Sequence, residues 1–171
     1  MTKKFLYIGM GLFVTIIIVV AIVAHMDTDD RVRVFEKQYK VDLPNDVALA
    51  TLYDDYGGVP YEGELLYRYS FSSQEGEQFI SSIIEAGDWK RLPLSAPLSH
   101  LMYGDTAEVG GFAKETGMPK IINGYWRLVG DNVNVLESND PQALDSLHSF
   151  NFSLAIYDED SKILYMFSID T

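Results

Sequence analysis

The feature that most constrains this chain is a run of apolar residues close to its N-terminus. From Phe5 to Ala24 the sequence has no charged side chain, and aliphatic residues dominate it. A helix rises about 1.5 Å per residue, so roughly 20 apolar residues cross the hydrocarbon core of a bilayer. Backbone groups left unpaired in lipid cost several kcal/mol each, which leaves a helix as the stable form of such a run. The sequence therefore predicts a transmembrane helix within residues 1–24.

The charges on either side of this run predict its orientation. Lys3 and Lys4 come directly before it, whereas Arg31 and Arg33 lie further away and are mixed with acidic residues. Lysine and arginine close to a span favour the cytoplasmic side of the membrane. We therefore expect a single-pass protein of the cell membrane, with its N-terminus in the cytoplasm and its C-terminal domain outside.

A cleavable signal peptide is the alternative to this signal anchor. The apolar region of a signal peptide usually has 7–15 residues and ends at a site with small residues. Here the run is longer, and a cut after Ala24 would have Ile22 where a small residue is needed. These features favour an uncleaved anchor over a secreted soluble protein.

The composition excludes several classes of function. The chain has 13 basic and 25 acidic residues, a formal net charge of −12 and no cysteine. Such an excess of negative charge argues against binding to nucleic acid. Without cysteine there can be no disulfide, thiolate metal ligand or cysteine nucleophile. We predict no cofactor.

The spacing of apolar residues predicts three segments: the anchor in residues 1–24, a juxtamembrane linker and helix in residues 25–46, and an extracytoplasmic domain in residues 47–171. In the linker, Val32, Phe35 and Tyr39 recur at helical spacing. In the domain, apolar residues alternate over 47–53 and 64–72, and again over 150–156 and 163–169, which is typical of two β-hairpins. Residues 124–129 form a further strand candidate around Trp126.

Helices are predicted between these strands. Ser72 and Glu75 have the spacing of a capping box, an apolar stripe follows, and Gly87 stands where a left-handed C-cap is expected. Shorter helices are expected after Pro97 and Pro141. The predicted fold class is α+β: one N-terminal transmembrane helix followed by a mainly antiparallel sheet with two or three short helices.

The domain contains the residue groups Tyr53 to Gly58 with Gly63 and Glu64, Trp89 to Leu94, Asn123 to Trp126, Phe150 to Asp158, Leu164-Tyr165 and Asp170-Thr171. In these groups the chain resembles small, uncharacterised membrane-anchored proteins of Gram-positive bacteria. In that group an acidic Gly-Gly loop precedes a strand, and a terminal hairpin closes the chain. The resemblance implies a single compact domain and implies no catalytic residue.

The loop between the first two predicted strands is the best candidate binding site. Its carboxylates would suit Ca²⁺, but the fixed spacing of a calcium-binding loop is missing. Its tyrosines would suit a sugar or a protein interface, and a solvated loop with Tyr53 in the core accounts for the same residues. No metal ligand is assigned. The candidate binding residues are Tyr53, Asp54, Asp55, Tyr56, Tyr61, Glu62 and Glu64.

No motif in the sequence indicates catalysis. His100 and His148 are isolated, and Ser99 lies in neither a G-x-S-x-G nor an S-x-x-K motif. The acidic run Asp158 to Asp160 suits a hairpin turn better than a cation site. We therefore predict a membrane-anchored module that binds an unknown protein or envelope partner and has no catalytic residue. The alternatives are a cell-envelope enzyme, with or without a metal, and a secreted soluble protein.

Overall fold

A computed structural model describes residues 30–44, 47–56, 62–104 and 111–171 of the chain. The chain divides into two compact units, Met1–Lys40 and Val41–Thr171. In the first unit, residues 30–39 are helical, as the spacing of Val32, Phe35 and Tyr39 predicts. The rings of Phe35 and Tyr39, one helical turn apart, are stacked with their centroids 4.6 Å apart.

The predicted transmembrane helix requires a correction. No helix in the part of the chain that the structure describes is both long and apolar enough to cross a membrane. The longest described helix, α2 (Ser73–Ala86), has only 14 residues and includes Glu75, Glu77 and Glu85, whereas a span needs about 20 apolar residues. The predicted fold class is therefore wrong in placing such a helix before the sheet. The predicted helix and the predicted cell-membrane location both depend on residues 5–24, which lie outside the described residues.

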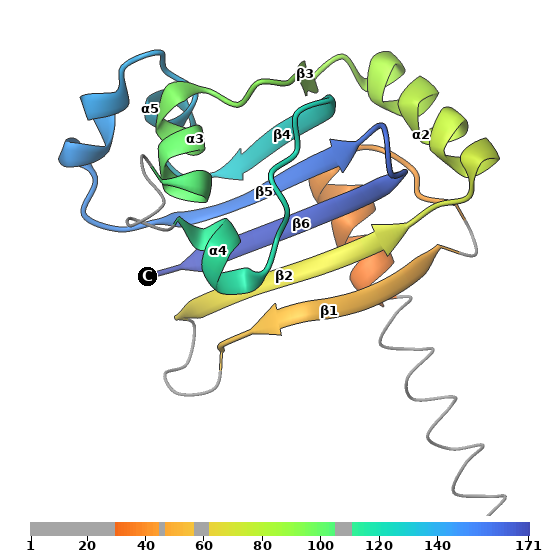
Figure 1. Cartoon of the computed structure of the whole chain (residues 1–171), viewed down its shortest axis with the longest axis horizontal. Helices are drawn as coiled ribbons and strands as arrows, with labels where there is room; N and C mark the ends of the chain where they lie inside the picture. Colours follow the sequence, from red (N-terminus) through yellow and green to blue (C-terminus); the bar gives the residue numbers. More distant parts are fainter. Residues whose placement is uncertain (1–29, 45–46, 57–61, 105–110) are drawn as a thin grey trace, which may run out of the picture. The chain divides into compact units, whose positions relative to one another are not determined.

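The second unit is an α+β domain built on one antiparallel sheet (Figure 1). The six strands that the structure describes lie in the order β1-β2-β6-β5-β4-β3, so the hairpin of the last two occupies the middle. Every neighbouring pair is antiparallel. The strands are β1 (Ala48–Asp54), β2 (Gly63–Ser70), β3 (Lys90–Arg91), β4 (Gly124–Gly130), β5 (Asn151–Asp158) and β6 (Ile163–Asp170).

The main core lies on one face of this sheet, which we call the α3 face. Leu66, Leu154 and Phe167 lie opposite one another in neighbouring strands and are fully buried. Three helices cover the face: α3 (Ala96–Tyr103), α4 (Phe112–Thr116) and α5 (Val133–Leu136) (Figure 1). Phe112 of α4 stacks on Phe167 at 5.1 Å between ring centroids. Burial of these aliphatic and aromatic side chains is the main source of the domain's stability.

The opposite face, which we call the Tyr67 face, is also buried. Tyr67, Ala155 and Met166 lie opposite one another on it, each at most 8 % exposed. Helix α2 packs at one end of this face, where the Phe79 ring lies 5.2 Å from that of Tyr157. The predicted capping box is present at the start of α2, and Gly87 ends the helix with a φ of 71°. A 3₁₀ helix, η1 (Pro141–Ser146), precedes β5.

Candidate functional site

The predicted binding residues lie at the end of β1 and the start of β2. Tyr53 and Asp54 belong to β1, and Asp55 and Tyr56 follow it directly. Glu62 precedes β2, and Glu64 is its second residue. Residues 57–61, including Tyr61, lie outside the described residues. The structure therefore places six of the seven candidates at one end of a hairpin.

Backbone contacts hold the two sides of this hairpin together beyond the strands. The Asp55 N–H donates to the Glu64 carbonyl at 2.9 Å, and the Tyr56 N–H donates to Asp54 Oδ1 at 3.2 Å. A Cβ at Gly63 would lie 2.9 Å from the Asp55 carbonyl oxygen, and Gly63 has a φ of 156°. This close approach explains why a glycine stands there, since any side chain would push the strands apart.

The candidate residues separate onto the two faces of the sheet. Tyr53 lies opposite Leu66, and Glu64 lies opposite Ile169, which puts both on the α3 face. Asp54 lies opposite Leu65, on the Tyr67 face. The pKa of the Tyr56 phenol is raised by burial first, and then by Asp170 and Asp54, so Tyr56 belongs with Asp54. The sequence predicted one cluster, and the structure shows two.

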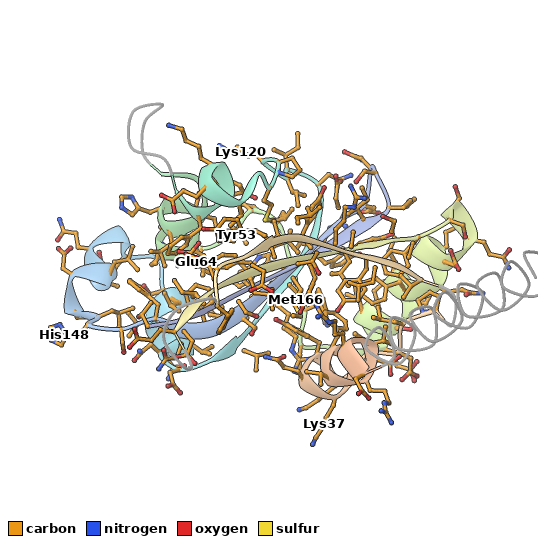
Figure 2. The ribbon with its side chains drawn as sticks, turned by 90° about the horizontal axis from the view of Figure 1, so that it is seen from below. Lys37, Tyr53, Glu64, Lys120, His148 and Met166 are labelled. Carbon is orange, nitrogen blue, oxygen red and sulfur yellow. The ribbon has the colours of Figure 1, made fainter. Side chains whose placement is uncertain are left out.

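On the α3 face a residue that sequence reasoning missed joins the candidates. Burial is the main cause that raises the pKa of Glu64 and of Tyr53, and the charge of Glu115 on α4, far away in the sequence, raises both further. Nothing in the pattern around Glu115 signals this, because only the packing of α4 against the sheet brings it there. The Tyr53 ring packs against the core, as the solvated-loop interpretation of the sequence expected. Figure 2 shows Tyr53 and Glu64 next to each other.

Glu64 has the most unusual electrostatic environment of this group. Burial raises the pKa of its carboxyl, and the charges of Glu115 and Asp55 raise it further. Its Oε2 atom is buried and accepts no hydrogen bond from the described residues. A carboxylate in this position is poorly solvated, so a cationic or hydrogen-bond-donating group brought against it would be favoured. Among the residues described, no three or more acidic or histidine side chains are arranged to hold a metal ion.

The outer edge of β1 lies next to these acidic residues. β1 is the first strand in the sheet order and, among the strands that the structure describes, it pairs only with β2. Its residues Ala48 to Tyr53 carry no charge and include no proline, and Ala48, Thr51 and Leu52 are exposed. Leu52 is the extra residue of a β-bulge, where the register with β2 shifts. Uncharged edge strands without proline are the kind to which another strand can pair.

The other edge of the sheet is built differently. β3 has only two residues, Lys90 and Arg91, and both carry charge. Lys90 Nζ lies 2.7 Å from Glu137 Oε2, and Arg91 Nη1 lies 2.5 Å from Glu159 Oε2. Short and charged edge strands are the usual way in which proteins prevent pairing between sheets. Only the β1 edge lacks this protection among the strands described.

The acidic run and the two histidines that the sequence singled out lie away from the end of the β1–β2 hairpin. Asp158 accepts hydrogen bonds from the Asp160 N–H at 3.0 Å and the Ser161 hydroxyl at 2.6 Å, which makes it part of the β5–β6 turn. His148 is exposed after η1, whereas His100 lies on α3. No protein-family profile, curated protein or solved structure matches this chain. The resemblance to the Gram-positive group therefore stays a prediction.

Proposed function

We propose that this protein is a binding module that takes up an extended, basic segment of another polypeptide as an additional strand beside β1. The observation that carries the proposal is an edge strand that has no charge from Ala48 to Tyr53, is partly exposed and ends in acidic residues. Strand addition of this kind obtains its affinity from main-chain hydrogen bonds and its specificity from side chains at alternate positions.

The geometry of β1 limits the length of the partner segment. At about 3.3 Å per residue, the seven residues of β1 extend over roughly 20 Å. The bulge at Leu52 interrupts the regular edge, so ordinary antiparallel or parallel pairing is expected along residues 48–50. Beyond the bulge the partner chain passes the acidic end of the hairpin. The partner therefore needs an uncharged extended stretch followed by, or preceded by, basic residues.

The charges favour a basic partner over a second copy of this chain. Asp54, Asp55 and Glu62 are exposed at the same end of the hairpin. The whole chain has a formal net charge of −12, so two copies repel each other. The same charge attracts a basic segment and increases the rate at which it associates. On the α3 face, Glu64 adds a carboxylate that benefits from a cationic neighbour.

The test uses the full chain, isotope-labelled for NMR, and a short synthetic peptide that alternates threonine and valine and has lysine and arginine at one end. Backbone amides of β1 should shift and exchange more slowly with solvent as the peptide is added. A peptide of the same sequence with methylated nitrogens at alternate residues should not bind, because it cannot donate the edge hydrogen bonds. A peptide with glutamate in place of the basic residues should bind more weakly.

Two protein variants localise the binding. Leu52→Lys places a charge on the exposed bulge of β1 and should weaken binding, because charged side chains on an edge oppose strand addition. Ile84→Lys makes the same change at an exposed position of α2, where Ile84 is 64 % exposed, and should bind as the wild type does. Equal binding of the methylated peptide, or shifts away from β1, would show that the proposal is wrong.

A further inference from the structure

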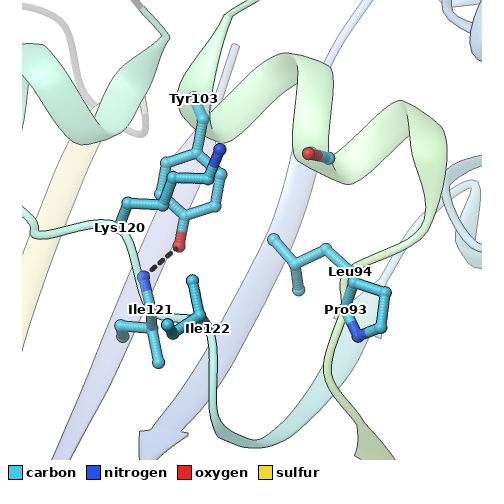
Figure 3. Close-up of a pocket in the computed structure, with 7 residues that line it drawn as sticks. Pro93, Leu94, Tyr103, Lys120, Ile121 and Ile122 are labelled. Carbon is cyan, nitrogen blue, oxygen red and sulfur yellow. Dashed lines mark hydrogen bonds between the residues drawn. The ribbon is translucent and has the colours of Figure 1, made fainter.

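A small pocket lies between α3 and the segment that leads into β4 (Figure 3). Its volume is about 160 Å³. Its walls include Leu94, Ser99, Tyr103, Lys120, Ile121 and Ile122. A cavity of about 150 Å³ in another protein holds one benzene molecule, so this pocket has room for one group of four to six carbon atoms. It is too small for a drug-sized ligand, which typically occupies 300–1,000 Å³.

The inner wall of the pocket is apolar. Leu94 and Ile121 are buried, at 8 % and 6 % exposure, and belong to the main core. Ile122 is 79 % exposed, the most exposed of the large apolar side chains described. An isoleucine at the mouth of an apolar pocket would lose part of this exposed surface to a ligand that fills the pocket. The hydrophobic effect therefore favours an apolar group here.

The mouth of the pocket carries hydrogen-bond donors and a positive charge. The Tyr103 hydroxyl accepts a hydrogen bond from the Ile121 N–H at 3.3 Å, which leaves its own proton to donate (Figure 3). Burial raises the pKa of this phenol, so it stays a neutral donor at physiological pH. The Lys120 ammonium lies 5.6 Å from the centroid of the Tyr103 ring. In the described part of the chain, no carboxylate forms an ion pair with Lys120.

We propose that this pocket binds a small monocarboxylate whose apolar group has four to six carbon atoms. The apolar group would contact Leu94, Ile121 and Ile122, while the carboxylate would pair with Lys120 and accept a hydrogen bond from Tyr103. A single negative charge is favoured over a phosphate dianion because the chain as a whole is strongly acidic. This proposal is independent of β1, since none of the residues that line the pocket belongs to β1 or β2.

The test measures NMR shifts of the full chain as three probes are added. 4-Methylpentanoate should shift the amides of Leu94, Tyr103 and residues 120–122 in a saturable manner at millimolar concentrations. 4-Methylpentanamide has the same shape without the charge and should bind about two- to fivefold more weakly, the effect expected of an exposed ion pair. Acetate lacks the apolar group and should cause no saturable shift.

Two lysine variants separate the local charge from the net charge. Lys120→Gln should lower the affinity for 4-methylpentanoate to that for the amide, and should leave the affinity for the amide unchanged. Lys37→Gln removes the same charge from an exposed helix position outside the pocket and should change neither affinity. The proposal is overturned by equal affinities for acid and amide, by equal effects of the two variants, or by shifts that do not saturate or that lie elsewhere.

Discussion

The packing of α2 against Tyr157 gives a prediction whose size can be worked out from the structure. Gly76 lies in the first turns of α2, and a Cβ added there would lie 2.6 Å from the Tyr157 hydroxyl and 2.8 Å from Lys162 Cδ. Tyr157 is fully buried, and its hydroxyl has no hydrogen-bond partner among the described residues. The lysine carbon is part of a flexible side chain that can move, whereas the phenol is fixed between aromatic rings.

Gly76→Ala therefore has two effects of opposite sign on the stability of the protein. Alanine in a helix is favoured over glycine by about 1 kcal/mol, while overpacking a filled core costs about 1–3 kcal/mol. As a single substitution, Gly76→Ala should lower the free energy of unfolding by about 1 kcal/mol. Tyr157→Phe removes the hydroxyl and should by itself raise the free energy of unfolding by about 1 kcal/mol, because it removes an unsatisfied buried polar group. In the Tyr157→Phe protein, Gly76→Ala should raise the free energy of unfolding by about 1 kcal/mol. The coupling energy between the two substitutions is then about 2 kcal/mol.

Thermal unfolding of the four proteins measures this coupling. For a protein of this length, 1 kcal/mol corresponds to about 2–4 °C in Tm. Gly76→Ala should therefore lower Tm in the wild type and raise it by a similar amount in the Tyr157→Phe background. The same loss of Tm in both backgrounds would show that the added methyl group does not meet the phenol, and would refute the packing of α2 described above.

Three further predictions concern single positions. Burial raises the carboxyl pKa of Glu64 above its ordinary value of 4.5, so the contribution of this group to stability is fullest below that value and is lost as pH rises through the folded-state pKa. Glu64→Gln should therefore increase Tm at neutral pH and increase it less at a pH of about 4. A difference in Tm that does not change with pH would contradict this. Ser72→Ala should cost about 1 kcal/mol in urea unfolding because it removes the N-cap of α2, whereas Ser81→Ala in the middle of that helix should cost almost nothing. Gly124→Ala should lower the free energy of unfolding by about 4 kcal/mol or more, since its Cβ would lie 1.8 Å from a carbonyl oxygen of β5. Gly117→Ala has free space around the new Cβ and should lower it only by the cost of the left-handed conformation, about 1–2 kcal/mol. Similar losses in the two variants would be evidence against the close approach of β4 to β5.

Local patterns predicted the longer strands and helices of the domain, but not the short helices α4 and α5. Alternation over 150–156 and 163–169 indicates the β5–β6 hairpin, and the structure pairs Leu154 with Phe167 in that hairpin. The capping box and Gly87 indicate the ends of α2. These features depend on residues close together in the sequence, whose conformational preferences act before the chain is folded.

The arrangement of the elements could not be predicted in this way. β6 lies between β2 and β5, and the alternation of its residues says nothing of which strand it pairs with on its second side. β5 is buried on both faces, so Ala155 and Tyr157 are as buried as Leu154 and do not form the polar face that alternation suggests. The candidate site was incomplete for the same reason, because only the packing of α4 brings the charge of Glu115 close enough to affect Glu64.

The central position of β5 and β6 determines when this domain can fold during its synthesis. The hairpin of β1 and β2 and the pair of β3 and β4 emerge from the ribosome first, but they have no contact with each other in the sheet until β5 and β6 lie between them. At roughly 5–20 residues per second, the earlier strands wait several seconds with their apolar faces open. The nascent chain is therefore expected to depend on chaperones until β5 and β6 have been synthesised, and shortened chains that lack β6 should be degraded instead of accumulating.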